Sequence, residues 1–371
     1  MPEIWLNYGA ADVVLDIKME NLNAYDNPNF SKLDDLELTK KLESVPLQDS
    51  NIFALDSSRS VSKIILSLTS LARQSGINNI TVQCLQKDYM SLSRKLDNIT
   101  LSVSKQSPNH LLQIGNDHRT VFIATTRADP LFGFEGLPTV ILRTFFKEKM
   151  TEAYNARTSN LPCPSVKSSP LQVAIETCKD MSANCLHVIS SNDSIDSLFY
   201  GQIVESFEKS IDRMRSLAQS DYANIRSMII SSDKNFDSYL NLSESLRYLW
   251  NCIHVLKNNG LGILLAENRN GLGADALRKF AEGKLTSDYT GSDVEYVDGV
   301  EHLLFMDEVK RKYQIGILSS LPRYYLNSKF GLQTFSRTQD ILNKIFEVYG
   351  RAHKILVISD PNQALFKYPI L

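Results

Sequence analysis

Residues 51–76 read NIFALDSSRSVSKIILSLTSLARQSG, and this stretch indicates the architecture of the chain. The apolar run 51–55 predicts a buried strand, which a short polar loop follows. From Val61 the apolar residues recur with the spacing of one helix face, and Gly76 is a typical helix-ending residue. A strand that leads through a short loop into an amphipathic helix is the repeating unit of a parallel or mixed sheet covered by helices.

The same alternation extends over most of the chain. Before residue 222 it predicts strands at 80–85, 99–103, 120–125 and 184–189, and helices at 137–154, 171–181 and 195–218. After the polar stretch 219–224 it predicts strands at 227–230, 261–266, 315–318 and 354–358, and helices at 242–258, 274–281, 300–312 and 338–350. We therefore expect an α/β fold of two three-layer domains, residues 1–222 and 223–371, with a ligand cleft between them.

The N-terminal fifty residues follow a different pattern. Two apolar runs, 4–8 and 13–17, are separated by the turn-like sequence GAAD, which predicts a β-hairpin. Residues 19–50 are polar and crowd Asn, Asp and Pro into a short space, so we expect them to connect elements rather than to form any.

The composition is that of an ordinary folded protein. Of the 371 residues 43% are hydrophobic and 22% are charged, which excludes disorder as the main state. The net charge is −2 and no long run of one sign occurs, so we expect no nucleic-acid partner. No apolar stretch reaches the ~18 residues of a membrane helix, and the first residues lack the order of a signal peptide. We therefore expect no membrane partner and a cytoplasmic location.

The cysteines and histidines form no metal or disulfide pattern. The five cysteines are far apart and include no C-x-x-C pair, so we expect reduced and mostly buried thiols. The six histidines show no close ligand spacing, and His187 and His254 fall inside predicted elements, where burial is their expected role. We therefore predict no metal site.

The first candidate ligand loop follows the strand 51–55. Ligands of open α/β sheets bind beyond the carboxyl ends of the strands, near helix N-termini. Here Asp56, Ser58 and Arg59 stand directly before a helix, and an arginine at this place is suited to bidentate capture of a carboxylate or phosphate. In the alternative interpretation Ser60 only caps the helix and Asp56 pairs with Arg59.

Polar, charged loops also follow the strands of the second half, at 231–234, 267–273, 319–323 and 359–362. Any one of them alone would be an ordinary solvated turn. Four on one edge, opposite a similar edge in the first half, favour a cleft between the domains. We expect Glu267, Gly271 and Gly273 to contribute to it.

Several of these landmarks resemble the nickel-dependent lactate racemase family. The N-terminal hairpin is similar to the family's opening, and Asp56-Ser57-Ser58-Arg59 is similar to its D-x-T-R loop. The stretch 260–273 is the most specific match, because it resembles the family's G-G-x-I-I-x-x-A-E-C-x-D-G-x-G signature. Weaker matches are the segment 130–136 with Gly133 and Gly136, which resembles a G-[FY]-x-G-G turn, the sequence 169–171 followed by Glu176, and Asp237.

The resemblance implies racemisation of a 2-hydroxy acid by removal and return of a hydride. In the family the hydride carrier is a nickel-pincer nucleotide, which is bound covalently to a lysine while a histidine also holds the nickel. Two further histidines act as acid and base on opposite faces of the substrate carbon.

This chain departs from the family at the residues that carry this chemistry. The anchoring lysine falls at Thr139, the nickel-binding histidine near Asn155 and one acid/base histidine at Asp129. The other acid/base histidine falls near Gln86 or Lys87, and a further lysine falls at about Ser245. Threonine cannot form the lysine linkage, and asparagine is a poor nickel ligand beside imidazole.

We therefore expect a divergent lactate-racemase-like protein that binds a small anionic ligand, either a 2-hydroxy acid or a nucleotide-like molecule, with the nickel-pincer chemistry lost and no cofactor. The expected ligand-binding residues are Asp56, Ser58, Arg59, Gly133, Gly136, Glu267, Gly271 and Gly273. Two alternatives stay open. One is an active racemase with relocated residues, such as Lys147, Lys149 or His118, which would bind the nickel-pincer nucleotide. The other is a non-catalytic interaction protein on the same scaffold.

Overall fold

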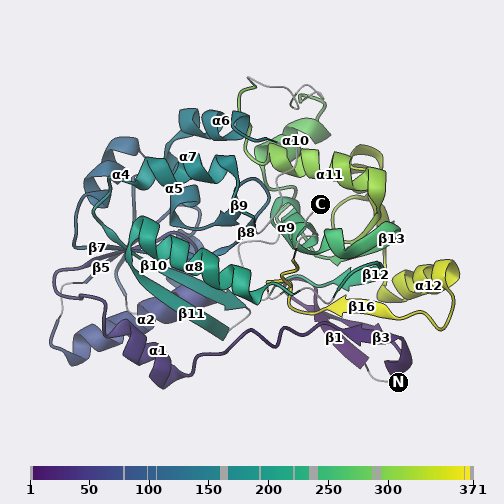
Figure 1. Ribbon diagram of the computed structural model, residues 1–371, viewed down its shortest axis with the longest axis horizontal. Helices are drawn as coiled ribbons and strands as arrows, with labels where there is room; N and C mark the ends of the chain where they lie inside the picture. Colours follow the sequence, from purple (N-terminus) through teal and green to yellow (C-terminus); the bar gives the residue numbers. More distant parts are fainter. Residues whose placement is uncertain are drawn as a thin grey trace.

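Two six-stranded sheets, each between layers of helices, form the two halves of the protein (Figure 1). The computed structural model describes residues 3–77, 80–97, 99–105, 107–158, 166–191, 194–219, 222–233, 241–285, 289, 294–362 and 364–367. The first sheet has the strand order β11-β10-β7-β4-β5-β6, and the second has the order β15-β14-β13-β12-β16-β3. We call the two halves the first and the second unit. The expected α/β class with two three-layer parts is confirmed.

In the first unit all neighbouring strands are parallel except β11, which runs antiparallel to β10. Its sheet consists of β4 (Asn51–Ala54), β5 (Thr81–Cys84), β6 (Leu101–Val103), β7 (Thr120–Thr125), β10 (Asn184–Ser191) and β11 (Ser194–Gln202). Its helices are α1 (Asp35–Leu42), α2 (Arg59–Gln74), α3 (Tyr89–Lys95), α4 (Pro108–Gly115), α5 (Leu137–Phe145), α6 (Lys147–Asn155), α7 (Ser169–Cys178) and α8 (Ile203–Leu217). A small hairpin of β8 (Arg127–Asp129) and β9 (Gly133–Glu135) extends toward the second unit.

In the second unit every strand pairing of the sheet is parallel. Its strands are β3 (Leu22–Ala24), β12 (Ile225–Ile230), β13 (Leu256–Leu265), β14 (Gln314–Leu318), β15 (Gln333–Phe335) and β16 (Ile355–Ile358). Its helical segments are α9 (Leu242–Cys252), a 3-10 turn (Ile253–Val255), α10 (Asp275–Ala281), α11 (Val300–Lys312), a π-helix (Tyr324–Lys329) and α12 (Thr338–Tyr349).

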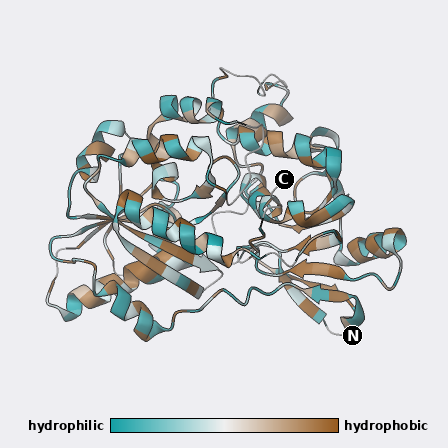
Figure 2. Ribbon diagram, in the orientation of Figure 1, coloured by the Kyte–Doolittle hydropathy of each residue, from teal (hydrophilic) through white to brown (hydrophobic). Residues whose placement is uncertain are grey.

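The alternation of side chains along the strands builds a core on each face of each sheet. In β4, Ile52 and Ala54 pack with α1 and α2, whereas Phe53 packs on the opposite face with α4 and α5. In β12, Ile229 packs with α12, whereas Met228 packs with α9 and α11. In Figure 2 the strands are largely hydrophobic, while the covering helices alternate between hydrophobic and hydrophilic residues. Such two-sided burial is expected of parallel strands.

The N-terminal segment lies with the second unit, which differs from the expected boundary of 1–222. The hairpin of β1 (Glu3–Asn7) and β2 (Asp12–Asp16) forms as predicted, and its buried Leu6 and Leu15 cover one face of the second sheet. The strand β3 then pairs with β16 at the edge of that sheet. Residues 19–50 therefore do form elements, because α1 follows with a capping box in which Asp34 and Glu37 bond each other's backbone N–H groups.

The predicted helix 242–258 ends at Cys252, and a 3-10 turn and the strand β13 from Leu256 follow it. Two further predicted helices have different bounds in the structure. The segment 195–218 begins as the strand β11, which forms a hairpin with β10, and becomes helical only at Ile203. The segment 137–154 is divided at Phe146 into α5 and α6. In both cases the apolar spacing continues across a change of backbone conformation, so periodicity alone does not reveal the boundary.

The units share one continuous apolar core. Phe132 and Phe134 of the β8–β9 hairpin belong to the same buried cluster as Trp250 of α9 and Phe305 of α11. The four described cysteines are free and buried, and Cys163 lies outside the described residues. None of the helices in the described part of the chain is both long and apolar enough to cross a bilayer.

Candidate functional site

The candidate site lies where loops at the carboxyl edges of the two sheets approach one another. Ser191 at the end of β10 donates a hydrogen bond to the carboxylate of Asp360, which follows β16. Burial is the main cause that raises the pKa of Asp88, which follows β5, and the charge of Glu244 in α9 adds to the rise. Residues of both units therefore interact electrostatically at this edge.

Asp56 fixes the conformation of the loop after β4 through two hydrogen bonds. It is almost fully buried, and its Oδ1 accepts a hydrogen bond from the Ser58 N–H at 3.0 Å. Its Oδ2 accepts one from the Thr125 N–H, also at 3.0 Å, which ties the loop after β4 to the end of β7. The cap of α2 is Ser58, whose hydroxyl accepts from the Val61 N–H at 3.2 Å, rather than the Ser60 of the alternative interpretation.

Arg59 is the exposed cation of this loop. It is the first residue of α2, a 16-residue helix whose first turn holds no acidic residue, so the positive end of the helix dipole favours an anion there. Buried hydroxyls line the same edge: Ser58 Oγ lies 3.4 Å from Thr125 Oγ1, and Ser60 Oγ lies 2.7 Å from Ser190 Oγ. The loop thus combines a guanidinium, a helix N-terminus and hydroxyl groups, which suits a small anion.

Glu267, Gly271 and Gly273 surround the beginning of α9 in the second unit. The Oε2 atom of Glu267 accepts a hydrogen bond from the Ala10 N–H in the N-terminal hairpin at 3.1 Å. The Gly271 carbonyl accepts from the Leu242 N–H at 3.0 Å. Gly273 has a φ of +81°, and a Cβ there would lie 2.3 Å from Ser243 Oγ, so glycine is required at this position. That these residues share one groove with Arg59 stays a prediction.

Gly133 and Gly136 have packing roles in the structure. Gly133 has a φ of +81°, and a Cβ there would lie 1.8 Å from the Val166 carbonyl oxygen. A Cβ on Gly136 would lie 2.3 Å from the ring of Phe207. Both glycines therefore allow close approach of chain segments within the first unit.

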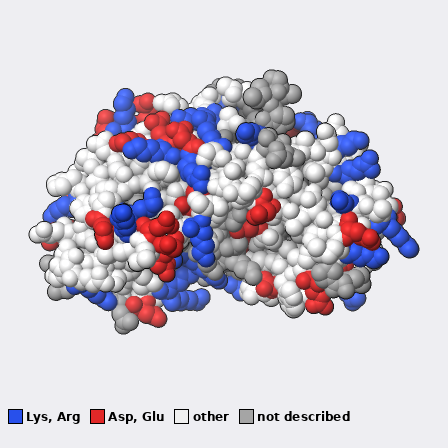
Figure 3. Space-filling model, turned by 60° about the horizontal axis from the view of Figure 1, so that its bottom comes forward, with Lys and Arg blue, Asp and Glu red and all other residues white. Residues whose placement is uncertain are grey.

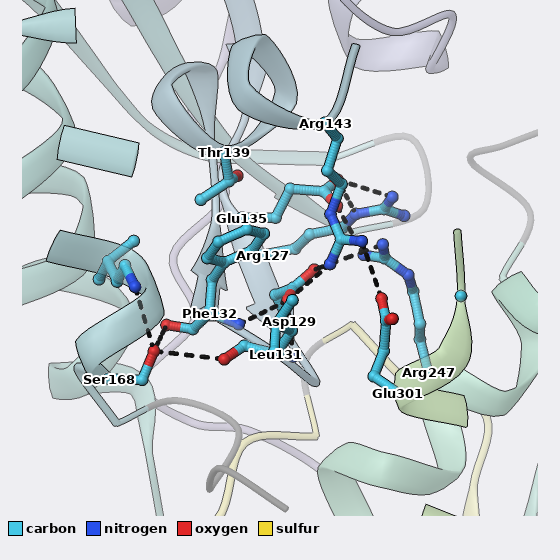
Figure 4. A network of polar contacts seen from close by, with 12 residues as sticks. Arg127, Asp129, Leu131, Phe132, Glu135, Thr139, Arg143, Ser168, Arg247 and Glu301 are labelled. Carbon is cyan, nitrogen blue, oxygen red and sulfur yellow. Dashed lines mark hydrogen bonds and ion pairs between the residues drawn. The ribbon is translucent and has the colours of Figure 1, made fainter. Parts of the chain in front are cut away.

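A buried set of ion pairs, which we call the interunit network, connects the β8–β9 hairpin and α5 to the second unit (Figure 4). Its members are Arg127, Asp129, Glu135 and Arg143 of the first unit and Glu244, Arg247, Tyr296 and Glu301 of the second. The sequence did not predict these charge pairs, because the paired residues lie up to 158 positions apart in the chain.

Arg143 is the centre of one half of the interunit network. Its Nη2 lies 3.1 Å from both carboxylate oxygens of Asp129, while its Nη1 lies 2.8 Å from Glu301 Oε1 and 2.7 Å from the Tyr296 hydroxyl. Burial alone would raise the pKa of Glu301, but the Arg143 charge lowers it below its usual range. Glu301 is therefore held as a carboxylate inside the protein.

Arg247 of α9 is the centre of the other half. Its Nη1 lies 2.7 Å from Glu135 Oε2, and its Nη2 lies 3.4 Å from Asp129 Oδ2. Burial opposes ionisation of Glu135, but Arg127 and Arg247 hold the pKa of this carboxyl well below its ordinary value. Buried charges are stable only when they are paired in this way, so the interunit network favours one fixed arrangement of the two units.

The residues at the positions of the family chemistry do not fit a nickel-pincer nucleotide. Thr139 is fully buried, and its hydroxyl lies 3.0 Å from both the N and the O of Gly136, where it caps α5. Asp129 belongs to the interunit network, as Figure 4 shows, whereas Thr139 lies apart from it. The Asn155 amide donates to the Val294 carbonyl at 3.3 Å, and the Ser245 hydroxyl donates to Asn268 at 2.9 Å. None of these side chains offers the amine or the imidazole that the cofactor requires.

The buried His187 has a structural role, and the described ranges hold no cluster of metal ligands. There, no three His, Cys, Asp or Glu side chains come together in an arrangement that would hold a metal ion. His187 is fully buried as predicted, and burial lowers its pKa to about 3. Its Nε2 accepts a hydrogen bond from the Leu137 N–H at 3.3 Å, so this neutral imidazole completes the N-terminus of α5.

A cavity of about 580 Å³ lies between the units beside the interunit network. The first unit contributes Arg143 and Lys147, and the second contributes Lys279, Tyr296 and Asp298 to its lining. None of the eight predicted ligand-binding residues lines this cavity. That a ligand binds between the two halves stays a prediction. Of the residues that the sequence singled out, Lys147, a candidate of the racemase alternative, lines this cavity.

Asp88 is the residue of the first edge that the sequence reasoning missed. It follows β5, as Asp56 follows β4, so the rule that ligands bind beyond strand ends could have found it. In Figure 3, Lys and Arg are intermixed with Asp and Glu over the face shown, without a stripe of one sign. This pattern is typical of neither a duplex-binding surface nor an anionic-membrane surface.

The fold and this edge define the class of the protein: a two-unit α/β protein whose strand-end loops meet between the units. Neither family models nor curated protein sequences match the chain. Among solved structures, the chain resembles the lactate racemase apoprotein from Thermoanaerobacterium thermosaccharolyticum, with a TM-score of 0.71, 16% identity, and coverage of 99% of this chain and 100% of that one.

A second similar structure is that of a protein from Thermotoga maritima. Its TM-score is 0.59 at 9% identity, with coverage of 92% of this chain and 100% of that one. At these identities the comparisons show a shared fold. The chain therefore has a lactate-racemase-like fold over its whole length.

Proposed function

We propose that this protein binds a small anionic ligand, a hydroxy acid or a nucleotide-like molecule, between its two units, and that it does so without nickel-pincer racemase chemistry. The observation that carries the proposal is the loop after β4, in which Arg59 begins a long helix whose first turn holds no acidic residue. A helix N-terminus with a guanidinium beside it supplies both charge and directed donors to a carboxylate or phosphate.

The geometry of Asp56 supports a binding role for this loop. Since both of its oxygens accept backbone N–H bonds, the carboxylate serves to shape the loop. In the opposing interpretation the aspartate would neutralise Arg59. With the loop held in place by Asp56, a small anion at the start of α2 would meet both the N–H donors of the helix end and the guanidinium.

Thr139 and Asp129 stand where the family has an anchoring lysine and an acid/base histidine, and neither suits racemase chemistry. The first caps a helix and the second is locked to two arginines, so neither is available to hold a cofactor or to move a substrate proton. The active racemase remains the second candidate because of Lys147, which lines the cavity between the units and carries an amine of the required kind.

A melting screen tests the proposal. The purified protein is heated with lactate, propionate, inorganic phosphate or a mononucleotide, and binding raises the melting temperature in proportion to occupancy. We expect at least one of these anions to stabilise the protein, with chloride at equal ionic strength as the control. No stabilisation by any of them would refute the proposed function.

A further inference from the structure

Asp88 is a buried carboxyl group with an incomplete set of partners. Its exposed fraction is 2%, and its Oδ2 has no hydrogen-bond partner among the described residues. The Ser57 hydroxyl bonds the carboxyl group from the loop that precedes α2. None of the ion pairs within the described part of the chain includes Asp88.

The neighbouring carboxylates are satisfied, which makes Asp88 the exception at this edge. Asp56 accepts two backbone N–H bonds, and Glu244 lies 3.4 Å from Arg127 Nη2 and 3.3 Å from Arg247 Nε. The arginines of the interunit network are thus engaged with other acids. The exposed Lys87 is the cation whose charge acts most on Asp88, and Lys95 donates a hydrogen bond to the carbonyl of the neighbouring Ser57 at 2.8 Å.

Burial, rather than neighbouring charge, is the main influence on the pKa of Asp88. Burial raises its pKa to about 6, the charges of Asp56 and Glu244 add to the rise, and Lys87 and Ser57 oppose it. Burial raises the pKa of the Cys84 thiol, and the charge of Asp88 adds to this rise. Near neutral pH, Asp88 is therefore mostly an ionised carboxylate in a site where ionisation is costly.

A buried carboxylate of this kind is stabilised by a cation that also donates a hydrogen bond. A hydroxyl group would satisfy only the hydrogen bond, whereas an ammonium group would satisfy the charge as well. Ser57, which contacts Asp88, is two residues from Arg59. The loop that touches the Asp88 carboxyl group therefore also carries a positive charge.

We propose that Asp88 receives the ammonium group of a zwitterionic ligand whose anionic group binds at Arg59, so that the site selects small amino acids over hydroxy acids. This inference rests on the anion site of the proposed function, and it replaces the hydroxy acid named there by a carboxylate that carries an ammonium group. The Ser57 hydroxyl, which bonds the Asp88 carboxyl group, places this group beside the loop that carries Arg59.

The test compares three acids that differ in one substituent, namely alanine, lactate and propionate, by titration calorimetry and by melting temperature. We expect alanine to bind tightest, by roughly tenfold or more over propionate, which is the effect of one charge-assisted hydrogen bond. In Asp88→Asn the advantage of alanine should disappear. In the control Asp117→Asn, which removes an exposed carboxylate paired with Arg119, it should persist.

The pH dependence provides a test on the unmodified protein. Since the ammonium group pairs with the ionised carboxylate, the affinity for alanine should fall as the pH is lowered from 7 to 5, while that for propionate should not fall in parallel. Equal or tighter binding of lactate, or an alanine preference that survives in Asp88→Asn, would overturn the assignment of Asp88 alone. Failure of lactate, propionate and phosphate to bind would overturn the proposed function, and failure of alanine as well would overturn this inference with it.

Discussion

Arg143 of α5 and Glu301 of α11 form a buried ion pair across the boundary of the two units, with Nη1 2.8 Å from Oε1. The arginine side chain is 15% exposed and the glutamate side chain 3%. Because water solvates neither charge well, each needs the other as its partner. The pair is therefore stable only while both units keep their present arrangement. The boundary is therefore a fixed internal surface at this point.

Replacing one partner of this pair should destabilise the protein strongly. In Arg143→Met the carboxylates of Glu301 and Asp129 lose their buried cation, and we expect a loss of about 3–5 kcal/mol in the free energy of unfolding. Urea denaturation followed by fluorescence measures this loss. The surface pair of Lys179 and Glu176 is the control, since Lys179→Met should change stability by less than about 0.5 kcal/mol. A loss in Arg143→Met as small as that of the control would contradict the role of the interunit network.

Mild acid should destabilise the protein through its buried histidines. Burial lowers the pKa of His187 to about 3 and that of His302 to about 4, below the value of about 6.5 in an unfolded chain. Between pH 6.5 and 5 the unfolded state therefore binds more protons, so stability falls as the pH falls, by about 1.4 kcal/mol per pH unit for each such histidine. Asp88 has a raised pKa, so the folded state binds its proton before the unfolded state does as the pH falls. This effect increases stability in acid, but it involves one proton only.

Urea midpoints at pH 6.5, 5.75 and 5 measure this dependence. In His187→Gln the slope should decrease by about 1.4 kcal/mol per pH unit, because one proton fewer distinguishes the two states. His118, which is exposed, provides the control variant His118→Gln, and its slope should match the wild type. An unchanged slope in His187→Gln would contradict the neutral, buried state of this histidine.

The sequence was sufficient for the elements whose apolar period is unbroken. The strand β7 and the helix α11 have the predicted bounds, because within each of them the apolar pattern and the backbone conformation begin and end together. The strand β11 was not predicted, because Ile195 and Leu198 are spaced as on a helix that continues into α8. Its hairpin partner β10 determines its conformation instead.

The site was predictable to the extent that it depends on strand ends. The loop with Arg59 was found because a strand and a helix flank it directly. The pairing of Asp129 with Arg143 and Arg247 was not found, because it depends on how α5, α9 and the β8–β9 hairpin meet in space. No local pattern encodes such a contact, since each arginine taken alone resembles a surface residue.

Exposure to the cofactor-making enzymes should leave the protein unmodified. Thr139 has no amine, and its hydroxyl is bonded within the cap of α5. After co-expression we expect an intact mass equal to that of the sequence and nickel at background level by elemental analysis. Lactate racemase from Thermoanaerobacterium thermosaccharolyticum, expressed in the same cells, is the positive control. An added mass on Lys147 or Lys149 would restore the racemase alternative.

Arg59 should be the residue whose loss most weakens anion binding. In Arg59→Ala the two donors of the guanidinium are removed from an exposed position at the start of α2, so thermal stability should stay nearly unchanged. The stabilisation by lactate, phosphate or alanine should drop, since loss of a charged hydrogen-bond partner weakens binding roughly tenfold to a hundredfold. Lys63→Ala is the matched control, because it removes an exposed cation four residues later on the same helix, where Lys63 pairs with Asp35. If Arg59 instead only braces its loop, the variant would melt at a lower temperature and keep its full response to ligands, and the anion site would have to lie elsewhere.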